Sequence, residues 1–276
     1  MMLWTVIILG IICVLARCFF AWRDVEYRAV ETDGMCQITG NREVQADAMG
    51  ITATAAGKLA VLADGIGKEN TGKVCAALAV EGFEEAFAVY RVLNNPQYFF
   101  ERTMYSLHKK TQKLLEERTG GAGVGAVFFT DTKLWYASTG QVKVLLVRNG
   151  ELIPLSEGQT VAVLAQRAWR EGKLGRQETL WALSNGEAVN YVGKDGFLGA
   201  ELCDVPITLK KGDLAVLMTK GIYEEVPGAQ LEKVLAAGGL TAQEKAERIA
   251  GLAAKAPGQD KENGSIMVLP TDGATG

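Results

Sequence analysis

The sequence predicts an α+β domain with mainly antiparallel sheets, preceded by one N-terminal transmembrane helix. Two observations predict the domain. Strand segments joined by short polar turns outnumber possible strand–helix–strand crossovers, and helices come in pairs between the groups of strands. A third observation predicts the helix that precedes it, because the chain begins with a long apolar run. The length of 276 residues suits one sizeable domain together with this segment.

Residues 3–22 read LWTVIILGIICVLARCFFAW, a run long enough to span a bilayer as a helix, with Arg17 as its one charged side chain. A cleaved signal peptide would need basic residues before the run and small residues at its end, and neither is present. Arg17, Arg23 and Arg28 lie at or beyond the C-terminal end of the run. The positive-inside rule therefore predicts a single-pass membrane protein with its globular domain in the cytoplasm. A buried core helix or an uncleaved signal-like segment is the alternative.

The predicted organisation has four parts: a transmembrane anchor at 1–23, a juxtamembrane segment at 24–34, a domain at 35–270 and a tail at 271–276. Hydrophobic periodicity assigns the elements of the domain in order. Strands are expected at 58–63, 123–130, 133–138, 142–147, 205–209, 213–219 and 265–269, and helices at 71–93, 97–118, 159–185 and 241–255. The helical stretch 159–185 is expected to break at Gly172 and Gly175, and Asn149-Gly150 predicts a tight hairpin.

Composition excludes several classes of function. The single histidine, His108, excludes a multi-histidine zinc site, and its place beside an apolar helical stripe is typical of an ordinary helix-face residue. A net charge of −3 gives no general attraction to nucleic acid. The five cysteines are odd in number and lack paired C-x-x-C spacing, which favours a reducing compartment.

Four short stretches carry the candidate chemistry. They are GNREVQADA at 40–48, ADGIG at 63–67 followed by Gly72, KGDLAVLMTKG at 211–221, and DKENGSIMV at 260–268. Each stretch alone is a weak signal, since Asp-Gly is first of all a turn dipeptide. Their order and spacing are far more specific.

Together these stretches resemble the PPM-type metal-dependent protein phosphatases, the protein phosphatase 2C family, in the bacterial form. The resemblance covers about residues 35–270. It rests on Arg42 and Asp47 in the first block, on Asp64, Gly65 and Gly72 in the second, on residues 140–148 as a G-D-S-R strand, on 212–221 as a G-D-x-L-L-L-x-S-D-G block, and on 262–265 as a D-N-x-T block. The resemblance implies an α-β-β-α sandwich of two mainly antiparallel sheets flanked by helix pairs.

The resemblance also implies hydrolysis of phosphoserine or phosphothreonine by water held between two divalent cations, Mg or Mn. By this resemblance Asp64 is a bridging metal ligand, the Gly65 carbonyl is a second ligand, and Asp47 acts through metal-bound water. Arg42 is the phosphate clamp, and Glu262 stands at the position of a further metal-ligating aspartate. Hard cations of this kind take oxygen ligands, which explains the acidic residues.

Three positions depart from the family pattern where the metal needs its ligands. The aspartate of S-D-G is Lys220, the aspartate of G-D-S-R, which helps to hold an auxiliary metal, is Gln141, and the last aspartate is Glu262. An ammonium group has no free lone pair and cannot coordinate a cation. Either Lys220 pairs with Asp64 and Glu262 in place of the second ion, or it points to solvent.

Two hypotheses of function follow. The first is a membrane-anchored cytoplasmic pseudophosphatase, weak or inactive, that binds a phosphoprotein, a kinase or another signalling partner and needs one metal ion or none. The second is an active Mg/Mn-dependent serine/threonine phosphatase with an altered metal site. Lys220, Gln141 and Glu262 favour the first hypothesis, whereas Arg42, Asp47 and Asp64 favour the second.

Overall fold

The computed structural model describes residues 32–89, 94–258 and 260–272, which form one compact unit from Asp33 onward. The expected anchor at 1–23 lies outside these residues, as does most of the expected juxtamembrane segment. Within the described part, no helix is long and apolar enough to cross a membrane.

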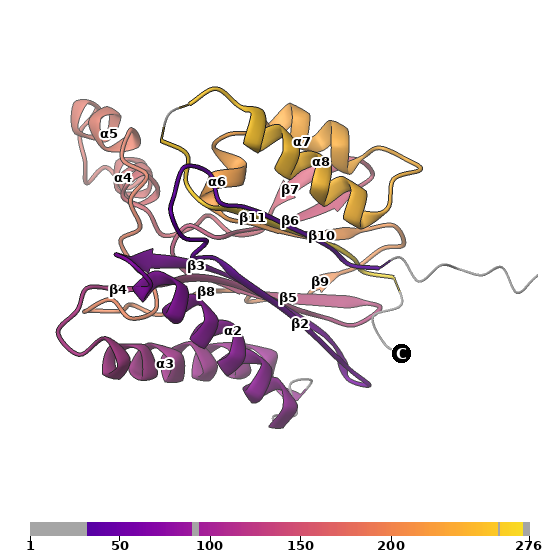
Figure 1. The fold of residues 1–276 in the computed structure, drawn as a ribbon, viewed down its shortest axis with the longest axis horizontal. Coiled ribbons are helices and arrows are strands. Elements are labelled where there is room, and N and C mark those ends of the chain that lie inside the picture. Colours follow the sequence, from indigo (N-terminus) through magenta and orange to yellow (C-terminus); the bar gives the residue numbers. More distant parts are fainter. Residues whose placement is uncertain (1–31, 90–93, 259, 273–276) are drawn as a thin grey trace, which may run out of the picture. The chain divides into compact units, whose positions relative to one another are not determined.

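Two antiparallel sheets form the centre of the domain (Figure 1). Sheet A contains, in spatial order, β1 (Gly34–Ile38), β11 (Gly264–Pro270), β10 (Leu214–Met218), β6 (Lys143–Arg148) and β7 (Glu151–Pro154). Sheet B contains β2 (Ala48–Thr54), β3 (Gly57–Gly67), β4 (Gly120–Phe129), β5 (Lys133–Ser138) and β8 (Glu201–Leu202), and the short β9 (Ile207–Thr208) also pairs with β5. The predicted α+β class with antiparallel sheets is confirmed.

Helices cover the two outer faces of this sandwich (Figure 1). The pair α2 (Thr71–Val89) and α3 (Pro96–Leu115) packs on sheet B, and α6 (Lys220–Tyr223), α7 (Gly228–Leu235) and α8 (Ala242–Lys255) pack on sheet A. A separate hairpin of α4 (Val161–Arg170) and α5 (Arg176–Leu183) projects from one end. We call this hairpin the flap.

Alternation along the strands places apolar side chains in three layers. In β3, Leu59 and Val61 face the helices α2 and α3, whereas Ala60 and Leu62 face sheet A. All four side chains are almost completely buried. Because the period is two residues, Asp64 follows Leu62 on the inner face, at the end of the sandwich.

Most predicted elements are present, with one informative difference at Asp64-Gly65. The sequence suggested that this dipeptide ends a strand, as Asp-Gly often does. The structure instead continues β3 through both residues, which pair with Gly123 and Ala122 of β4. A side-chain Cβ at Gly65 would lie 2.4 Å from the carbonyl oxygens of Ala46 and Gly72, so the glycine permits close packing rather than a turn.

His108 is a structural residue, as its place on α3 suggested. Its side chain is buried, its Nδ1 accepts a hydrogen bond from the Gly193 amide, and its ring stacks on Phe197. Burial, together with nearby Lys109, lowers its pKa, which favours the neutral form.

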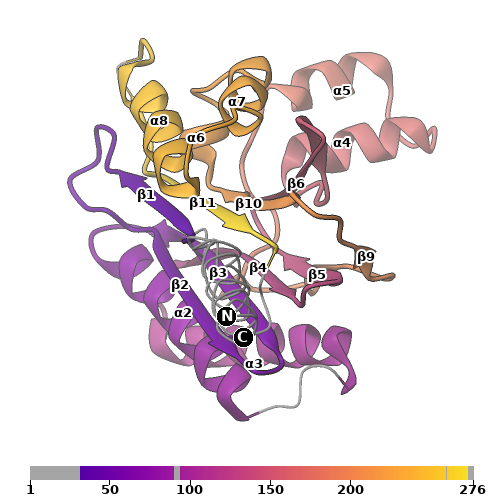
Figure 2. The same ribbon diagram turned by 90° about the vertical axis from the view of Figure 1, so that its right-hand side faces the viewer.

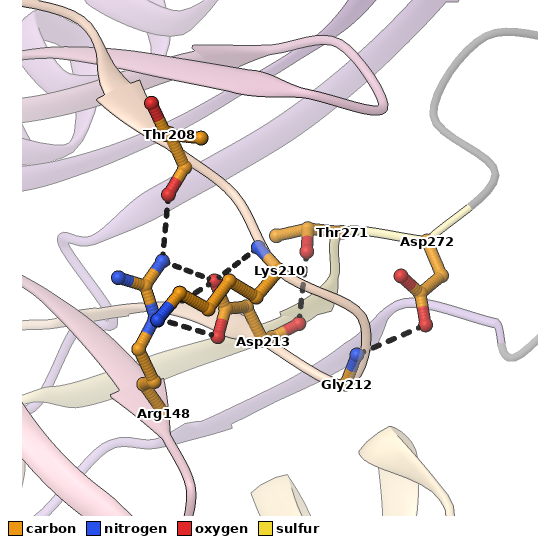
Figure 3. A network of polar contacts seen from close by, with 7 residues as sticks. All are labelled: Arg148, Thr208, Lys210, Gly212, Asp213, Thr271 and Asp272. Atoms are coloured by element: carbon orange, nitrogen blue, oxygen red, sulfur yellow. Dashed lines mark hydrogen bonds and ion pairs between the residues drawn. The ribbon is translucent and has the colours of Figure 1, made fainter.

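The aspartate of the Gly212-Asp213 pair fixes the strands of sheet A (Figure 3). Asp213 is buried and receives hydrogen bonds from the Arg148 guanidinium, the closest at 2.6 Å, and from the Lys210 amide. Arg148 also donates to the Thr208 carbonyl, so the ion pair joins β6 and β10 of sheet A to β9 of sheet B. Asp213, at the start of the predicted block 212–221, therefore has a structural role, because a buried carboxylate needs such hydrogen-bond partners.

Candidate active site

A pocket of about 280 Å³ opens at the end of the sandwich where the predicted motifs meet. Three segments distant in sequence line it: the loop before β2, the end of β3, and the loop before β11. The lining residues are Arg42, Glu43, Val44, Ala46, Asp64, Gly65, Gly67, Glu69, Glu262 and Asn263. The structure thus brings Arg42, Asp64, Gly65 and Glu262 to one place.

Close backbone packing holds two of these loops together. The amide of Asn41 donates to the Lys261 carbonyl at 3.0 Å, and the Lys261 amide donates to Asn41 Oδ1. Gly40, at φ +64°, leaves no room for a side chain beside the Glu262 carbonyl. Lys261 is itself buried, and its ammonium donates to the last carbonyls of α8, at Ala253 and Ala254.

Asp47 lies below this pocket, held by two hydroxyl groups. Its Oδ2 accepts from Ser265 Oγ at 2.6 Å and from Thr219 Oγ1 at 3.0 Å. Its Oδ1 is buried, and no donor among the described residues forms a hydrogen bond with it. Burial raises the pKa of Asp47 to about 6, although the two hydroxyls act in the opposite direction.

Asp64 interacts directly with Asp47, so the two carboxyls form a coupled acidic pair. Burial, the charge of Asp47 and the charge of Glu262 raise the pKa of Asp64 well above its usual value, and Lys220 acts against them. Two close carboxylates cannot both ionise without a neighbouring cation, so one shared proton is favoured. The site is thus built for positive charge.

Lys220 supplies part of that charge. It begins α6, its side chain is 19% exposed, and its ammonium donates to Glu262 Oε1 at 2.9 Å. Burial lowers the pKa of Lys220, but the hydrogen bond and charge of Glu262 outweigh it and raise the pKa above the usual value. Of the two partners expected from the sequence, Glu262 forms the ion pair, while Asp64 acts on Lys220 only through its charge.

Arg42 is also engaged by acidic side chains. Its Nη1 lies 3.1 Å from Asp260 Oδ1, and its Nη2 lies 3.8 Å from Glu262 Oε1. The Arg42 side chain is 44% exposed and that of Asp260 is 83% exposed, so water screens their attraction. A phosphate group could replace Asp260 at Arg42 at low cost.

Several solved serine/threonine phosphatases have the same architecture as this chain. The serine/threonine phosphatase of S. agalactiae superposes with a TM-score of 0.75 at 19% identity, covering 86% of this chain and 98% of that one. The Mycobacterium tuberculosis serine/threonine phosphatase PstP/Ppp gives 0.72 at 19% identity, covering 87% and 98%. The chain has the PPM-type phosphatase fold.

The likeness to known phosphatases is one of structure rather than of sequence. The PPM Ser-Thr phosphatase MsPP from Mycobacterium smegmatis gives a TM-score of 0.68 at 19% identity, covering 86% of this chain and 97% of that one. No family model and no curated protein sequence matches the chain. Assignment of the PPM fold therefore rests on the arrangement of the elements, which the local motifs support.

The position of the auxiliary PPM metal ligand has a structural role in this chain. Gln141 donates through Nε2 to the Gly186 carbonyl, in the segment that follows α5. This amide contact joins the β5–β6 turn to the base of the flap. A carboxylate at the same position could not donate this hydrogen bond.

The residues present do not fit the two-cation centre that the PPM fold implies. Throughout residues 32–89, 94–258 and 260–272, no group of three acidic, histidine or cysteine side chains is arranged to hold a metal ion. Lys220 places a cation against Glu262, where a second metal would need that carboxylate. Within the described part of the chain, two buried side-chain oxygens, Asp47 Oδ1 and Asn263 Oδ1, have no hydrogen-bond donor.

Sequence reasoning missed three polar residues of this site. Thr219 and Ser265 hold Asp47, and the Ser265 amide donates to Thr219 Oγ1, which links the two hydroxyl groups. Asn263 joins the loops by donating from Nδ2 to the Val44 carbonyl. All three residues lie within the stretches 211–221 and 260–268, but the residue types alone do not indicate which side chains they contact.

Proposed function

We propose that this chain is a PPM-type phosphatase-like signalling protein with weak or absent hydrolytic activity, which acts by binding a partner. One observation carries the proposal: the Lys220 ammonium forms a 2.9 Å ion pair with Glu262 beside Asp64. Replacing an acidic ligand by lysine changes the local charge by the same amount as one divalent cation. The lysine therefore supplies the charge that the acidic pair needs without supplying a metal.

This substitution stabilises the site but removes the chemistry of a second cation. Bound divalent cations lower the pKa of water and neutralise charge on a phosphoryl group. A fixed ammonium can do only the second of these. Each 1.36 kcal/mol lost from transition-state stabilisation slows the reaction tenfold, so losing several kcal/mol reduces turnover by orders of magnitude.

Binding of a phosphorylated partner needs less from the site than hydrolysis does. Arg42 can present a planar pair of N–H donors to a phosphoserine or phosphothreonine. Its present partner Asp260 is highly exposed, so this ion pair is weak. We propose a phosphoprotein, a kinase or another signalling protein as the partner class.

The unpartnered oxygens of Asp47 and Asn263 favour a second candidate, an active phosphatase with one Mg or Mn ion. Asp64, the Gly65 carbonyl and Glu262 would hold the cation, and Asp47 would hold it through water. Such a cation supplies an activated water. Arg42 would orient the phosphate, while Thr219 and Ser265 would keep Asp47 in place.

Turnover of a small aryl phosphate separates the two candidates. The full chain with Mg or Mn should hydrolyse it no faster than the Arg42→Ala variant does, because the weak site contributes little beyond metal in solution. Release of the coloured phenolate measures both rates. Metal-dependent turnover that Arg42→Ala abolishes would contradict the inactive proposal and favour the one-metal enzyme.

We further propose that residues 3–22 anchor the protein in the membrane with the domain in the cytoplasm. The support is the apolar run and the position of Arg17 near its C-terminal end, with Arg23 and Arg28 beyond it. Protease added to intact cells should leave the domain uncut, and permeabilised cells should lose it. Digestion of the domain in intact cells would overturn this orientation.

A further inference from the structure

A second hollow lies on the outer face of sheet A, between the flap and α7. We call it the flap groove. It has a volume of about 720 Å³ and shares no lining residue with the candidate active site. Figure 2 shows α4, α7 and β6 near one another, and each of these elements contributes lining residues to the groove.

The floor and walls of the flap groove are mainly apolar. Leu145 and Met218 lie on the strands of sheet A, Val163 faces them from α4, and Leu231 from α7. Leu145 and Leu231 are only 5% and 3% exposed, so the floor belongs to the core between sheet A and the helices that cover it. A rigid apolar floor is suited to apolar side chains of a partner.

The charged residues at the groove edge indicate which charge the partner should carry. The Lys143 ammonium lies 3.8 Å from the centre of the Tyr223 ring, and neither Lys143 nor Arg170 has a carboxylate within ion-pair distance among the described residues. The acidic lining residue Glu157 is already paired with Arg167 at 3.0 Å. The groove therefore presents two positive charges that a negatively charged partner would complement.

The edge of sheet A is closed to a partner that would add a strand. β7 is the last strand of the sheet, but the Leu152 amide already donates to Glu232 Oε1. Pro154 has no amide hydrogen to offer. Recognition must then come from side chains that lie across the groove rather than from the backbone of an added strand.

We propose that the flap groove docks an acidic and apolar segment of a partner protein. Carboxylates of that segment pair with Lys143 and Arg170, and its apolar side chains pack on Leu152 and Val163, which are partly exposed in the groove. The inference rests on the proposed function, since this segment belongs to the partner that a protein of weak activity recruits. Tyr223, in the same helix as Lys220, forms the wall of the groove nearest the active site.

A steric block of the groove tests this proposal. Gly228 lines the groove, and a Cβ there would meet nothing within 4 Å, so Gly228→Trp fills the groove without a clash at the backbone. Gly238→Trp is the matched control, because Gly238 also has open space around it and lies outside the groove. A phage-displayed library of random dodecapeptides, selected on the full chain, provides the probe.

The enriched peptides should combine Asp or Glu with Leu, Ile or Phe. A synthetic, fluorescein-labelled copy should bind Gly228→Trp and Arg170→Glu about tenfold or more weakly than wild type by fluorescence polarisation. Gly238→Trp should bind it like wild type. Equal binding to all four proteins, or enrichment of peptides without acidic residues, would overturn the proposal.

The same variants also test whether a second copy of the chain or a lipid surface occupies the groove instead. If Gly228→Trp abolishes self-association in sedimentation equilibrium, or binding to phosphatidylserine vesicles, but no peptide depends on the groove, the proposal is wrong. The Asp64→Asn variant should bind the peptide normally. Groove-dependent peptide binding together with metal-dependent turnover of aryl phosphate would overturn only the inactive proposal, whereas the absence of both would overturn only this inference.

Discussion

Lys220→Asp should convert the protein from one that is insensitive to Mn into one whose stability depends strongly on Mn. Without metal, the variant places a further carboxylate beside Glu262 and Asp64, and repulsion should lower its melting temperature below that of wild type. With millimolar Mg or Mn, the restored oxygen ligand recreates a hard-cation site. Metal binding to the native state then raises the melting temperature. At a metal concentration a hundredfold above Kd, this binding stabilises the folded protein by about 2.7 kcal/mol.

Lys220→Ala separates the loss of the lysine from the gain of the aspartate. This variant removes the nearer cation beside Glu262 but leaves Arg42 at 3.8 Å, and because Glu262 is 39% exposed, water can also solvate it. We therefore expect a loss of only about 1–2 kcal/mol, less than for a fully buried pair. The exposed Lys211 gives a matched control, since Lys211→Asp lies outside the lining of the site pocket.

Differential scanning fluorimetry of the four proteins against Mn concentration provides the measurement. A large Mn-dependent shift in wild type, with none in Lys220→Asp, would mean that Lys220 lies outside the metal-binding position. A similar shift in Lys211→Asp would mean that the effect is one of net charge alone.

Asp47→Asn should stabilise the metal-free protein at neutral pH. Burial raises the pKa of Asp47 to about 6 from an ordinary value of 3.8, so the folded protein binds a proton that the unfolded chain releases between these values. The contribution of Asp47 to stability is therefore largest at acidic pH and is lost as the pH rises through this interval. At about 1.36 kcal/mol per pKa unit, ionised Asp47 costs the folded state about 3 kcal/mol above pH 7.

An asparagine avoids that cost and preserves the contacts. Its Oδ1 can accept from Thr219 and Ser265 as Asp47 Oδ2 does, and its Nδ2 can donate to Asp64. Urea unfolding of metal-free protein from pH 4 to pH 8 should show that the variant loses much of the decline seen in wild type. The exposed Asp204→Asn serves as the control. A variant that declines as steeply as wild type would contradict the raised pKa.

The sequence predicted the elements of the fold whose pattern is local. The strands 133–138 and 265–269 are mainly apolar, and the turn at Asn149-Gly150 requires the positive φ angles that the structure shows at both residues. β1 and β2 were not predicted, because they are edge strands with small or half-buried side chains. The helices α6 and α7 are too short for a clear helical period.

The sequence predicted the site residues that belong to recognisable motifs, but not the contacts between them. Arg42, Asp64, Gly65 and Glu262 were found by residue type and order, and the structure places them around one pocket. The ion pair of Lys220 with Glu262 depends on how close two loops 42 residues apart approach, which no local pattern determines. The hydroxyl groups that hold Asp47 likewise come from strand ends that meet only in the folded domain.

Isothermal titration calorimetry of the full chain with Mn tests the central claim most directly, because it counts the cations that the site accepts. The claim is that the Lys220–Glu262 ion pair takes the place of one of the two cations of the PPM fold. The titration should therefore show one weak Mn site or none in wild type, and additional Mn binding in Lys220→Asp. Two tight Mn sites in wild type, with no further binding in Lys220→Asp, would contradict the account.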